Sequence, residues 1–265
     1  MIMEKNNGFT PELSVILPVY NGEKFLDEAI KSTLNQTFKN FELIIINDCS
    51  TDNSLKIIKS YKDKRIKIIN NKKNGGFINS LNTGLSVAKG KYIACSNQDD
   101  ISFPRRFEIE FDYLEKNPHI FLVGSSAIYI NEAGDEIRRF RKYDNYKMLA
   151  WRLRKSCGII HPSTMFRNKN VSFDNHFEYH LYYNLLKRGE NLTNIPLFLI
   201  KFRVHKGSMS IYDKKNQIFL RDEVIEEFKE LRDNTSFFNK IYFSIVLFFH
   251  YIRTMNEKGI LHLNK

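Results

Sequence analysis

The stretch Tyr92-Ile-Ala-Cys-Ser-Asn-Gln-Asp-Asp100 decides the fold, because a short apolar run stops abruptly there at two adjacent carboxylates. Residues 92–95 are small and apolar, which predicts a buried strand of a parallel sheet. Ligands bind at the carboxyl edge of such sheets. Two neighbouring carboxylates repel each other unless a cation offsets their charge, and hard oxygen ligands suit Mg²⁺ or Mn²⁺ carrying a diphosphate. The alternative is that Asp99 and Asp100 cap the helix expected to begin near Pro104.

The residues before this stretch repeat one pattern, a buried apolar strand followed by a helix. Apolar runs predict strands at residues 13–20, 41–47 and 66–69. Apolar residues at helical spacing predict helices at 23–36, after residue 52 and through 78–88. This alternation is typical of a doubly wound parallel sheet. It places Asp48, which follows the second strand, at the same sheet edge as Asp99.

The composition limits the classes of protein and partner. The chain has 265 residues, 42% of them hydrophobic, which is enough for one large α/β domain or for a main domain with a C-terminal extension. The net charge of +11 suits nucleic acid, an anionic membrane surface or phosphate-bearing small molecules. Three widely spaced cysteines and a polar N-terminus predict a cytoplasmic protein without a disulfide framework or a secretory signal.

Several motifs in this half of the chain occur in a specific order. They are Val15-Ile-Leu-Pro-Val-Tyr-Asn-Gly22, Leu43-Ile-Ile-Ile-Asn-Asp-Cys-Ser-Thr-Asp-Asn53, Asn74-Gly75, Ala88-Lys-Gly-Lys-Tyr-Ile93 and Gln98-Asp-Asp100. The series resembles the nucleotide-binding half of family 2 glycosyltransferases. The resemblance implies an α/β, Rossmann-like GT-A fold with a mostly parallel central sheet flanked by helices. Residues 1–110 are then expected to bind the nucleotide-sugar and 111–212 the acceptor, with a C-terminal helical extension at 213–265.

The same resemblance implies a donor site at the carboxyl edge of the sheet. In the family, the turn after strand one and the aspartate after strand two embrace the nucleotide of a UDP-sugar or a similar donor. Asp48 is then expected to accept a hydrogen bond from the uracil; the alternative is an N-cap of the following helix. The donor-binding residues implied are Pro18, Val19, Tyr20, Asn21, Asp48, Lys73, Asn74, Asn97, Gln98, Asp99, Arg203 and His205, with Lys72 beside them.

The metal site is implied by two further motifs. The metal motif of the family usually reads Asp-x-Asp, whereas here its first position is Asn97, which shifts the metal load to Asp99 and leaves Asn97 for the ribose. Arg203-Val-His-Lys-Gly-Ser-Met-Ser210 resembles the Arg-x-His-x-Gly-Ser loop that closes over the donor. Basic side chains in such a loop predict a phosphate clamp. The metal ligands implied are therefore Asp99 and His205, and the ion Mn²⁺ or Mg²⁺.

The catalytic base is implied by the acceptor half. Cys157-Gly-Ile-Ile-His-Pro-Ser-Thr-Met-Phe-Arg167 resembles an acceptor-side strand, and Phe177-Glu-Tyr-His-Leu-Tyr-Tyr-Asn-Leu-Leu-Lys-Arg-Gly189 resembles the Glu-Asp-Tyr-Asp-Leu-Trp helix of the family. The base aspartate of that helix falls on Glu178, while Phe177 and His180 replace the acids on either side. The alternative is that Glu178 is a first-turn acid favoured by the helix dipole.

Two segments suggest contact with an anionic partner or a membrane. Residues 136–155 carry eight Lys or Arg against two acids. They predict either a solvated face or contact with a pyrophosphate-linked acceptor or anionic lipid headgroups. Residues 237–252 are mostly apolar, and a helix of their length, about 24 Å, is too short to cross a hydrocarbon core of about 30 Å. This segment is expected to lie in the membrane interface or to pack on the catalytic domain.

Together these features predict an inverting, metal-dependent hexosyl- or N-acetylhexosaminyltransferase. It would move a sugar from a UDP-sugar to a growing glycan or lipid-linked oligosaccharide, in capsule or lipopolysaccharide synthesis, in the cytoplasm or on the inner face of its membrane. One alternative is a sugar-phosphate nucleotidyltransferase, which normally has a Gly- and Arg/Lys-rich loop where this chain has Pro18-Val-Tyr-Asn-Gly22. The other is a basic nucleic-acid-binding protein, but no nucleic-acid module is recognisable, so no nucleic acid partner is expected.

Overall fold

The structure, a computed structural model, describes residues 10–142, 149, 158–169, 171–173 and 177–208; the expected extension at 213–265 lies outside them. The strands are β1 (Leu13–Val19), β2 (Phe41–Asn47), β3 (Ile66–Asn70), β4 (Tyr92–Cys95), β5 (Ile101–Ser102), β6 (Ile120–Ile130), β7 (Glu136–Phe140), β8 (Met165–Arg167) and β9 (Asn191–Arg203). The helices are α1 (Leu26–Leu34), α2 (Ser54–Ser60), α3 (Phe77–Val87), α4 (Arg106–Lys116) and α6 (Phe177–Lys187), with a 3₁₀ turn, η1 (His161–Ser163).

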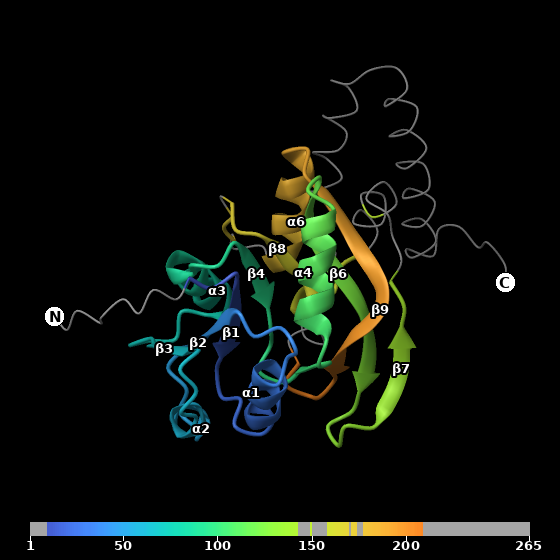
Figure 1. The fold of residues 1–265 in the computed structure, drawn as a ribbon. Coiled ribbons are helices and arrows are strands. Elements are labelled where there is room, and N and C mark those ends of the chain that lie inside the picture. Colours follow the sequence, from blue (N-terminus) through green and yellow to red (C-terminus); the bar gives the residue numbers. More distant parts are fainter. Residues whose placement is uncertain (1–9, 143–148, 150–157, 170, 174–176, 209–265) are drawn as a thin grey trace, which may run out of the picture.

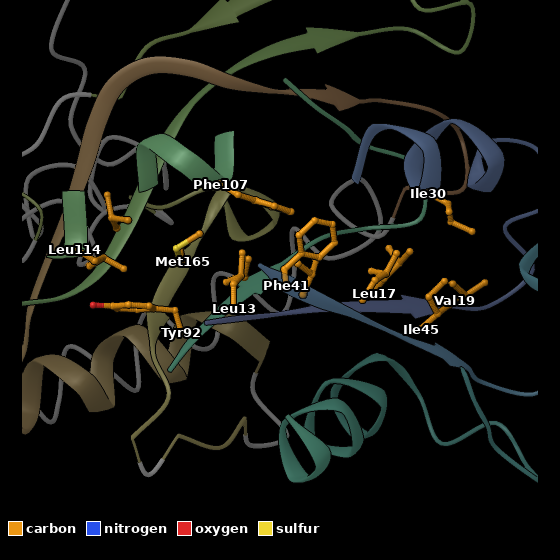
Figure 2. Packing of buried hydrophobic residues seen from close by; sticks show 14 of the residues in the cluster. Leu13, Leu17, Val19, Ile30, Phe41, Ile45, Tyr92, Phe107, Leu114 and Met165 are labelled. Carbon is orange, nitrogen blue, oxygen red and sulfur yellow. The ribbon is translucent and has the colours of Figure 1, made fainter. Parts of the chain in front are cut away.

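The first four strands form a parallel sheet with helices on both faces (Figure 1). Every residue of β1 and β2 is buried, which explains why these strands are continuous apolar runs. One face packs against α1, α2 and α4, and the other packs against α3 and α6. Figure 2 shows Leu17, Val19 and Ile45 of the sheet with Ile30 of α1 and Phe107 of α4 nearby. The predicted strand–helix alternation is confirmed.

β6 and β9, in the second half of the sheet, point the same way as β1, β2 and β4, because one antiparallel strand, β8, lies between β4 and β6. The strand order is β3-β2-β1-β4-β8-β6-β9-β5, with β7 also paired to β6. β8 runs antiparallel to β4, and β6 runs antiparallel to β8, so β6 points the same way as β4. β9 is parallel to β6. The carboxyl ends of β1, β2, β4, β6 and β9 therefore meet at one edge, toward which the arrowheads of β4 and β6 point in Figure 1.

The structure corrects several local expectations. α1 and α4 begin about three residues later than the sequence pattern suggested, at Leu26 and Arg106. The N-cap of α4 is Arg105 and that of α2 is Asn53, and neither helix has a side-chain cap. The capping alternatives for Asp48, Asp99 and Asp100 are therefore wrong. The short strand β5, which pairs with β9, was not expected. The division of the chain near residue 110 stays a prediction.

A buried ion pair lies beneath the carboxyl end of β4. Arg106 is 1% exposed, and its Nε donates to both carboxylate oxygens of Glu110 at 3.0 and 3.2 Å. The same guanidinium donates to Ser102 Oγ and to the backbone oxygens of Cys95 and Thr164. α4 is thereby attached to the ends of β4, β5 and β8. None of the described helices is both long enough and apolar enough to cross a membrane.

The turn before β4 fits against β1 only because residue 90 is glycine. A Cβ atom on Gly90 would lie 2.4 Å from the backbone nitrogen of Ser14 and 2.6 Å from the backbone carbon of Leu13. We expect Gly90→Ala to lower the free energy of unfolding by about 2 kcal/mol or more, since overpacking against backbone is not relieved by a rotamer change. Urea unfolding measures this loss.

The matched control is Gly75→Ala, because the three atoms nearest to its Cβ would all belong to the side chain of Asn79. It should change the free energy of unfolding by no more than about 1 kcal/mol, because a flexible side chain can move away. Equal losses in the two variants would show that the close approach at Gly90 does not constrain β4.

Candidate active site

Two loops that follow parallel strands meet at the carboxyl edge of the sheet. Asp99 follows β4, and His205 follows β9. His205 Nε2 lies 2.9 Å from Asp99 Oδ2, and the two side chains are 17% and 18% exposed. The structure thus brings together the two residues that the sequence suggested as metal ligands, although they are 106 positions apart in the chain. Their role as ligands stays a prediction.

Asp100, the second carboxylate of the pair, points into the protein. It is 7% exposed, and its Oδ1 accepts a hydrogen bond from the backbone N–H of Arg203 at 2.8 Å. Its Oδ2 accepts one from Asn97 Nδ2 at 3.1 Å. Burial, and then the neighbouring Asp99 carboxylate, raise the pKa of Asp100 well above its usual range. The two aspartates therefore differ: Asp100 joins β4 to β9, and Asp99 contacts His205.

Arg203 is buried and links three segments of the chain, an arrangement that we call the Arg203 brace. The sequence had suggested instead that Arg203 binds phosphate. It is 2% exposed, and all three of its side-chain nitrogens donate hydrogen bonds within the protein. Nε donates to the backbone oxygen of Asp99, and Nη1 donates to those of Asn131 and Glu132. Nη2 donates to the carboxylate of Glu28 on α1. Direct contact of Arg203 with a donor is untested, and these contacts favour a positioning role.

Phe25 and Glu28, which the sequence did not single out, complete this brace. The guanidinium of Arg203 lies 4.5 Å from the centre of the Phe25 ring. The centre of the His205 ring lies 5.1 Å from the centre of the same Phe25 ring. A guanidinium over an aromatic face is favourable, more so when it is withdrawn from water. Both residues lie in or just before α1, where apolar periodicity suggested only a core helix. Nothing in the local sequence indicated that they face residues 203–205.

Asp48 holds the loop that leads into α3. Its carboxylate accepts hydrogen bonds from Asn71 Nδ2 and from the backbone N–H groups of Gly75 and Gly76, at 2.7 to 3.2 Å. The side chain is nearly buried, at 3% exposed. Between these anchors Lys72, Lys73 and Asn74 are exposed at the sheet edge. Contact of Asp48 with a uracil stays a prediction; its visible role is to fix this loop.

The turn after β1 is clamped by Gln98. Gln98 Oε1 accepts from the backbone N–H of Tyr20 at 2.8 Å, and Nε2 donates to the backbone oxygen of Tyr20 at 3.1 Å. Asn21 is left-handed, with φ of 48°, and its Oδ1 accepts from the backbone N–H of Thr51 at 2.8 Å. Pro18 and Val19 are buried in β1, whereas Tyr20, 46% exposed, and Asn21 are exposed to solvent.

Two buried oxygens beside Asp99 lack a hydrogen-bond partner among the described residues. They are Ser96 Oγ and Asn97 Oδ1. Asn97 Nδ2 donates one of its two hydrogens to Asp100, and Asn97 Oδ1 accepts no hydrogen bond from the described residues. Buried polar atoms without partners are rare in folded proteins. These two oxygens are candidates for hydrogen bonds from a bound ligand, and the ribose contact of Asn97 stays a prediction.

Glu178 lies in the first turn of α6, and the described atoms do not include its side chain. The helix is anchored four residues further on by Tyr182, which is fully buried and whose hydroxyl lies 3.1 Å from His161 Nδ1. His161 is 5% exposed, and its Nε2 has no partner in the described part of the chain. The His-Pro-Ser stretch was the only signal for His161. The role of Glu178 stays a prediction.

The brace can be tested with Arg203→Lys, which keeps the charge but cannot reach acceptors on four sides. We expect the free energy of unfolding to fall by about 2 to 4 kcal/mol, because several buried acceptors lose their donor. The matched control is Arg138→Lys on β7, at an exposed position, which should change it by less than about 0.5 kcal/mol. Chemical denaturation compares the two, and equal losses would contradict the brace.

Comparison with known proteins places the chain in a family. A family model described as glycosyl transferase family 2 matches residues 14–173. The chain is 34% identical over 275 residues to an uncharacterized glycosyltransferase of Haemophilus influenzae, covering 96% of this chain and 82% of the relative. It is 28% identical over 224 residues to WfgD of Escherichia coli, covering 82% and 87%. WfgD is named a UDP-Glc:alpha-D-GlcNAc-diphosphoundecaprenol beta-1,3-glucosyltransferase.

The fold is similar to that of a solved structure, TarS of S. aureus. S. aureus TarS 1–349 in complex with UDP-GlcNAc superposes with a TM-score of 0.63 at 19% identity, covering 81% of this chain and 66% of the TarS chain. This likeness confirms the expected GT-A fold. The family model spans more than half of the sequence, and the Haemophilus relative aligns along most of both chains. The chain therefore belongs to glycosyl transferase family 2.

Proposed function

We propose that the protein is an inverting transferase that moves a hexose or N-acetylhexosamine from a UDP-sugar to a hydroxyl of a growing surface glycan or lipid-linked oligosaccharide. The observation that carries the proposal is the contact between Asp99 and His205, at the edge where Asp48 and the β1 turn also lie. The names of two similar proteins support it, since WfgD uses UDP-Glc and TarS was solved with UDP-GlcNAc. Family membership favours transfer over the nucleotidyltransferase and nucleic-acid-binding alternatives.

The nucleotide would lie between the β1 turn and the loop at 71–76. Tyr20 is exposed on one side, and Lys72, Lys73 and Asn74 are exposed on the other. Asp48 fixes the loop, and Gln98 fixes the turn, so both walls are preorganised. The free oxygen of Asn97 would accept a hydrogen bond from a ribose hydroxyl. Lysines at this edge would attract the negative diphosphate.

The residues at the edge fit a divalent cation that arrives with the donor. Within the described ranges no group of three or more His, Cys, Asp or Glu side chains is arranged to hold a metal ion. Asp99 and His205 would supply one oxygen and one nitrogen, and phosphate oxygens and water would complete the shell, as is usual for Mg²⁺ and is acceptable for Mn²⁺. The bound ion would stabilise negative charge on the departing diphosphate.

Glu178 would act as the general base. A sugar hydroxyl is a weak nucleophile at neutral pH, so a carboxylate must accept its proton while its oxygen bonds to the anomeric carbon. The bond from that carbon to the diphosphate oxygen breaks at the same time, and the electron pair leaves with the UDP. Attack from the face opposite the diphosphate inverts the anomeric configuration. We place the reaction in the cytoplasm or on the inner face of the membrane, where the free thiols of Cys49 and Cys95 would stay reduced.

The metal assignment predicts that Asp99→Asn loses the effect of Mn²⁺ on UDP binding. Calorimetric titration of the parent with UDP should show tighter binding with Mn²⁺ than with EDTA, and the variant should show equal, weak binding in both. Asp112→Asn, at a solvent-exposed position of α4, is the control and should behave as the parent. A full Mn²⁺ response in Asp99→Asn would remove this residue from the ligand set.

The base assignment predicts that Glu178→Gln binds UDP as the parent does but transfers sugar at least about a hundredfold more slowly, because glutamine keeps size and hydrogen bonding and lacks basicity. Single-turnover transfer from UDP-sugars to an undecaprenyl-diphosphate-linked acceptor measures the rate. Glu190→Gln, just beyond the end of α6, is the control. Near-parental turnover of Glu178→Gln would show that another group takes the proton.

A further inference from the structure

The outer part of the sheet presents basic and apolar side chains together, on a surface that we call the arginine face. It consists of Ile137, Arg139 and Arg141 in and after β7 and of Leu197 and Phe198 in β9. β7 pairs with β6 and has no other strand partner among the described residues, and in Figure 1 it lies at the side of the sheet opposite β3. This face lies outside the proposed active site.

The alternation of β7 places the two arginines on one side. Residues 139 and 141 are two apart, so they share a face of the strand. A bulge interrupts the alternation before them, because Arg138 pairs with Tyr129 and Glu136 with Ile130, which leaves Ile137 without a counterpart on β6. The guanidinium groups of Arg139 and Arg141 lie 5.8 and 5.6 Å from the centre of the same ring, that of Phe198. Both arginines are exposed. Guanidinium groups stacked on an aromatic ring still have N–H groups with which to bind phosphate.

A bulge in β9 pushes an aliphatic residue outward beside these arginines. Ser125 pairs with Ile195 and Ser126 with Phe198, so residues 196 and 197 have no counterpart on β6. Leu197 is 46% exposed. Ile137 is 58% exposed, more than any other large hydrophobic side chain in the described residues. The exposed aliphatic side chains and the exposed arginines together make this part of the protein an amphipathic surface.

The charge of this corner is strongly positive. Four basic residues, Arg138, Arg139 and Arg141 and, on β9, Lys201, stand against two acids, Asp135 and Glu136. Glu136 pairs with Arg139 at 2.8 Å. An exposed ion pair of this kind contributes little to folding stability, so Arg139 stays accessible to another anion. Positive charge attracts anionic lipid, and exposed aliphatic groups gain by entering the headgroup region. Single-stranded nucleic acid binds by stacking its bases on exposed aromatic rings. Here the Phe198 ring is already covered by both arginines, so this face does not favour nucleic acid.

We propose that the arginine face binds the anionic phospholipid headgroups of a bilayer. β7 begins after the turn at residues 131–135, whose backbone oxygens bind Arg203 beside Asp99. Docking through this face brings that edge of the protein to the lipid surface. The proposal concerns binding and does not depend on the transfer reaction. It assigns membrane contact to residues other than 237–252, which lie outside the described residues.

The test is flotation of the full chain with vesicles of phosphatidylcholine alone or with added phosphatidylglycerol. We expect the parent to bind the anionic vesicles and to be released by salt. Arg139→Gln/Arg141→Gln should lower the partition coefficient about 20-fold or more, since each basic residue near an anionic surface contributes roughly fivefold. Ile137→Ser/Leu197→Ser should lower the partition coefficient by a similar factor, because the variant lacks the two aliphatic side chains that would enter the headgroup region.

Matched controls are available at the other end of the sheet. Lys56→Gln/Lys59→Gln removes two exposed charges from α2, and Ile68→Ser/Val87→Ser removes two aliphatic groups that are each 41% exposed. Both should bind as the parent does. Leu197→Trp gives a second measurement, a blue shift of its added emission on anionic vesicles. Failure of the parent to bind, equal losses in target and control pairs, or an unshifted Leu197→Trp would each overturn the proposal. UDP binding, measured separately, should be unchanged in all four pairs.

Discussion

The buried guanidinium of Arg203 is the interaction on which the site depends. Removing such a charge from water is costly unless its N–H groups find acceptors, and here one carboxylate and three backbone oxygens accept hydrogen bonds from four of the five. The acceptors come from α1, from the loop after β4 and from the turn after β6. Because these segments are fixed around one residue, His205, two positions further on, is presented to Asp99. The basic loop and the acidic loop are thus one rigid unit before any ligand binds.

The sheet topology makes this convergence possible. The chain passes from β4 to β6 through the helix α4, as parallel strands require. The three-residue strand β8 lies between β4 and β6 in the sheet and is antiparallel to both, so β4 and β6 point the same way. The buried guanidinium of Arg106 donates hydrogen bonds to the backbone oxygens of Cys95 and Thr164, and so attaches α4 to the adjacent ends of β4 and β8. The first and second halves of the described chain consequently meet where Asp99, Asp100 and Arg203 lie.

The first half of the fold was readable from sequence because its information is local. Apolar runs that end in Asn, Asp and Gly place each strand and its loop with few alternatives, and the edge residues follow from parallel pairing. The rest is fixed by partners distant in the chain. β5 has two residues and exists through pairing with β9, about a hundred positions away. Whether Arg203 faces a ligand or the interior depends on carbonyl groups at residues 99, 131 and 132, which no local pattern reveals. Glu28 and His161 were missed for the same reason.

The way in which Asp48 holds its loop has a consequence for how such proteins diversify. At Gly75 and Gly76 the carboxylate binds main-chain N–H groups, so the path of the loop does not depend on the side chains of Lys72 and Lys73. Those two positions can change in size, charge and hydrogen-bonding capacity while the backbone stays where it is. In the proposed donor site, selection for a different nucleotide base would therefore act on these two positions with little loss of folding stability, and a change of donor would require new side chains but no new loop.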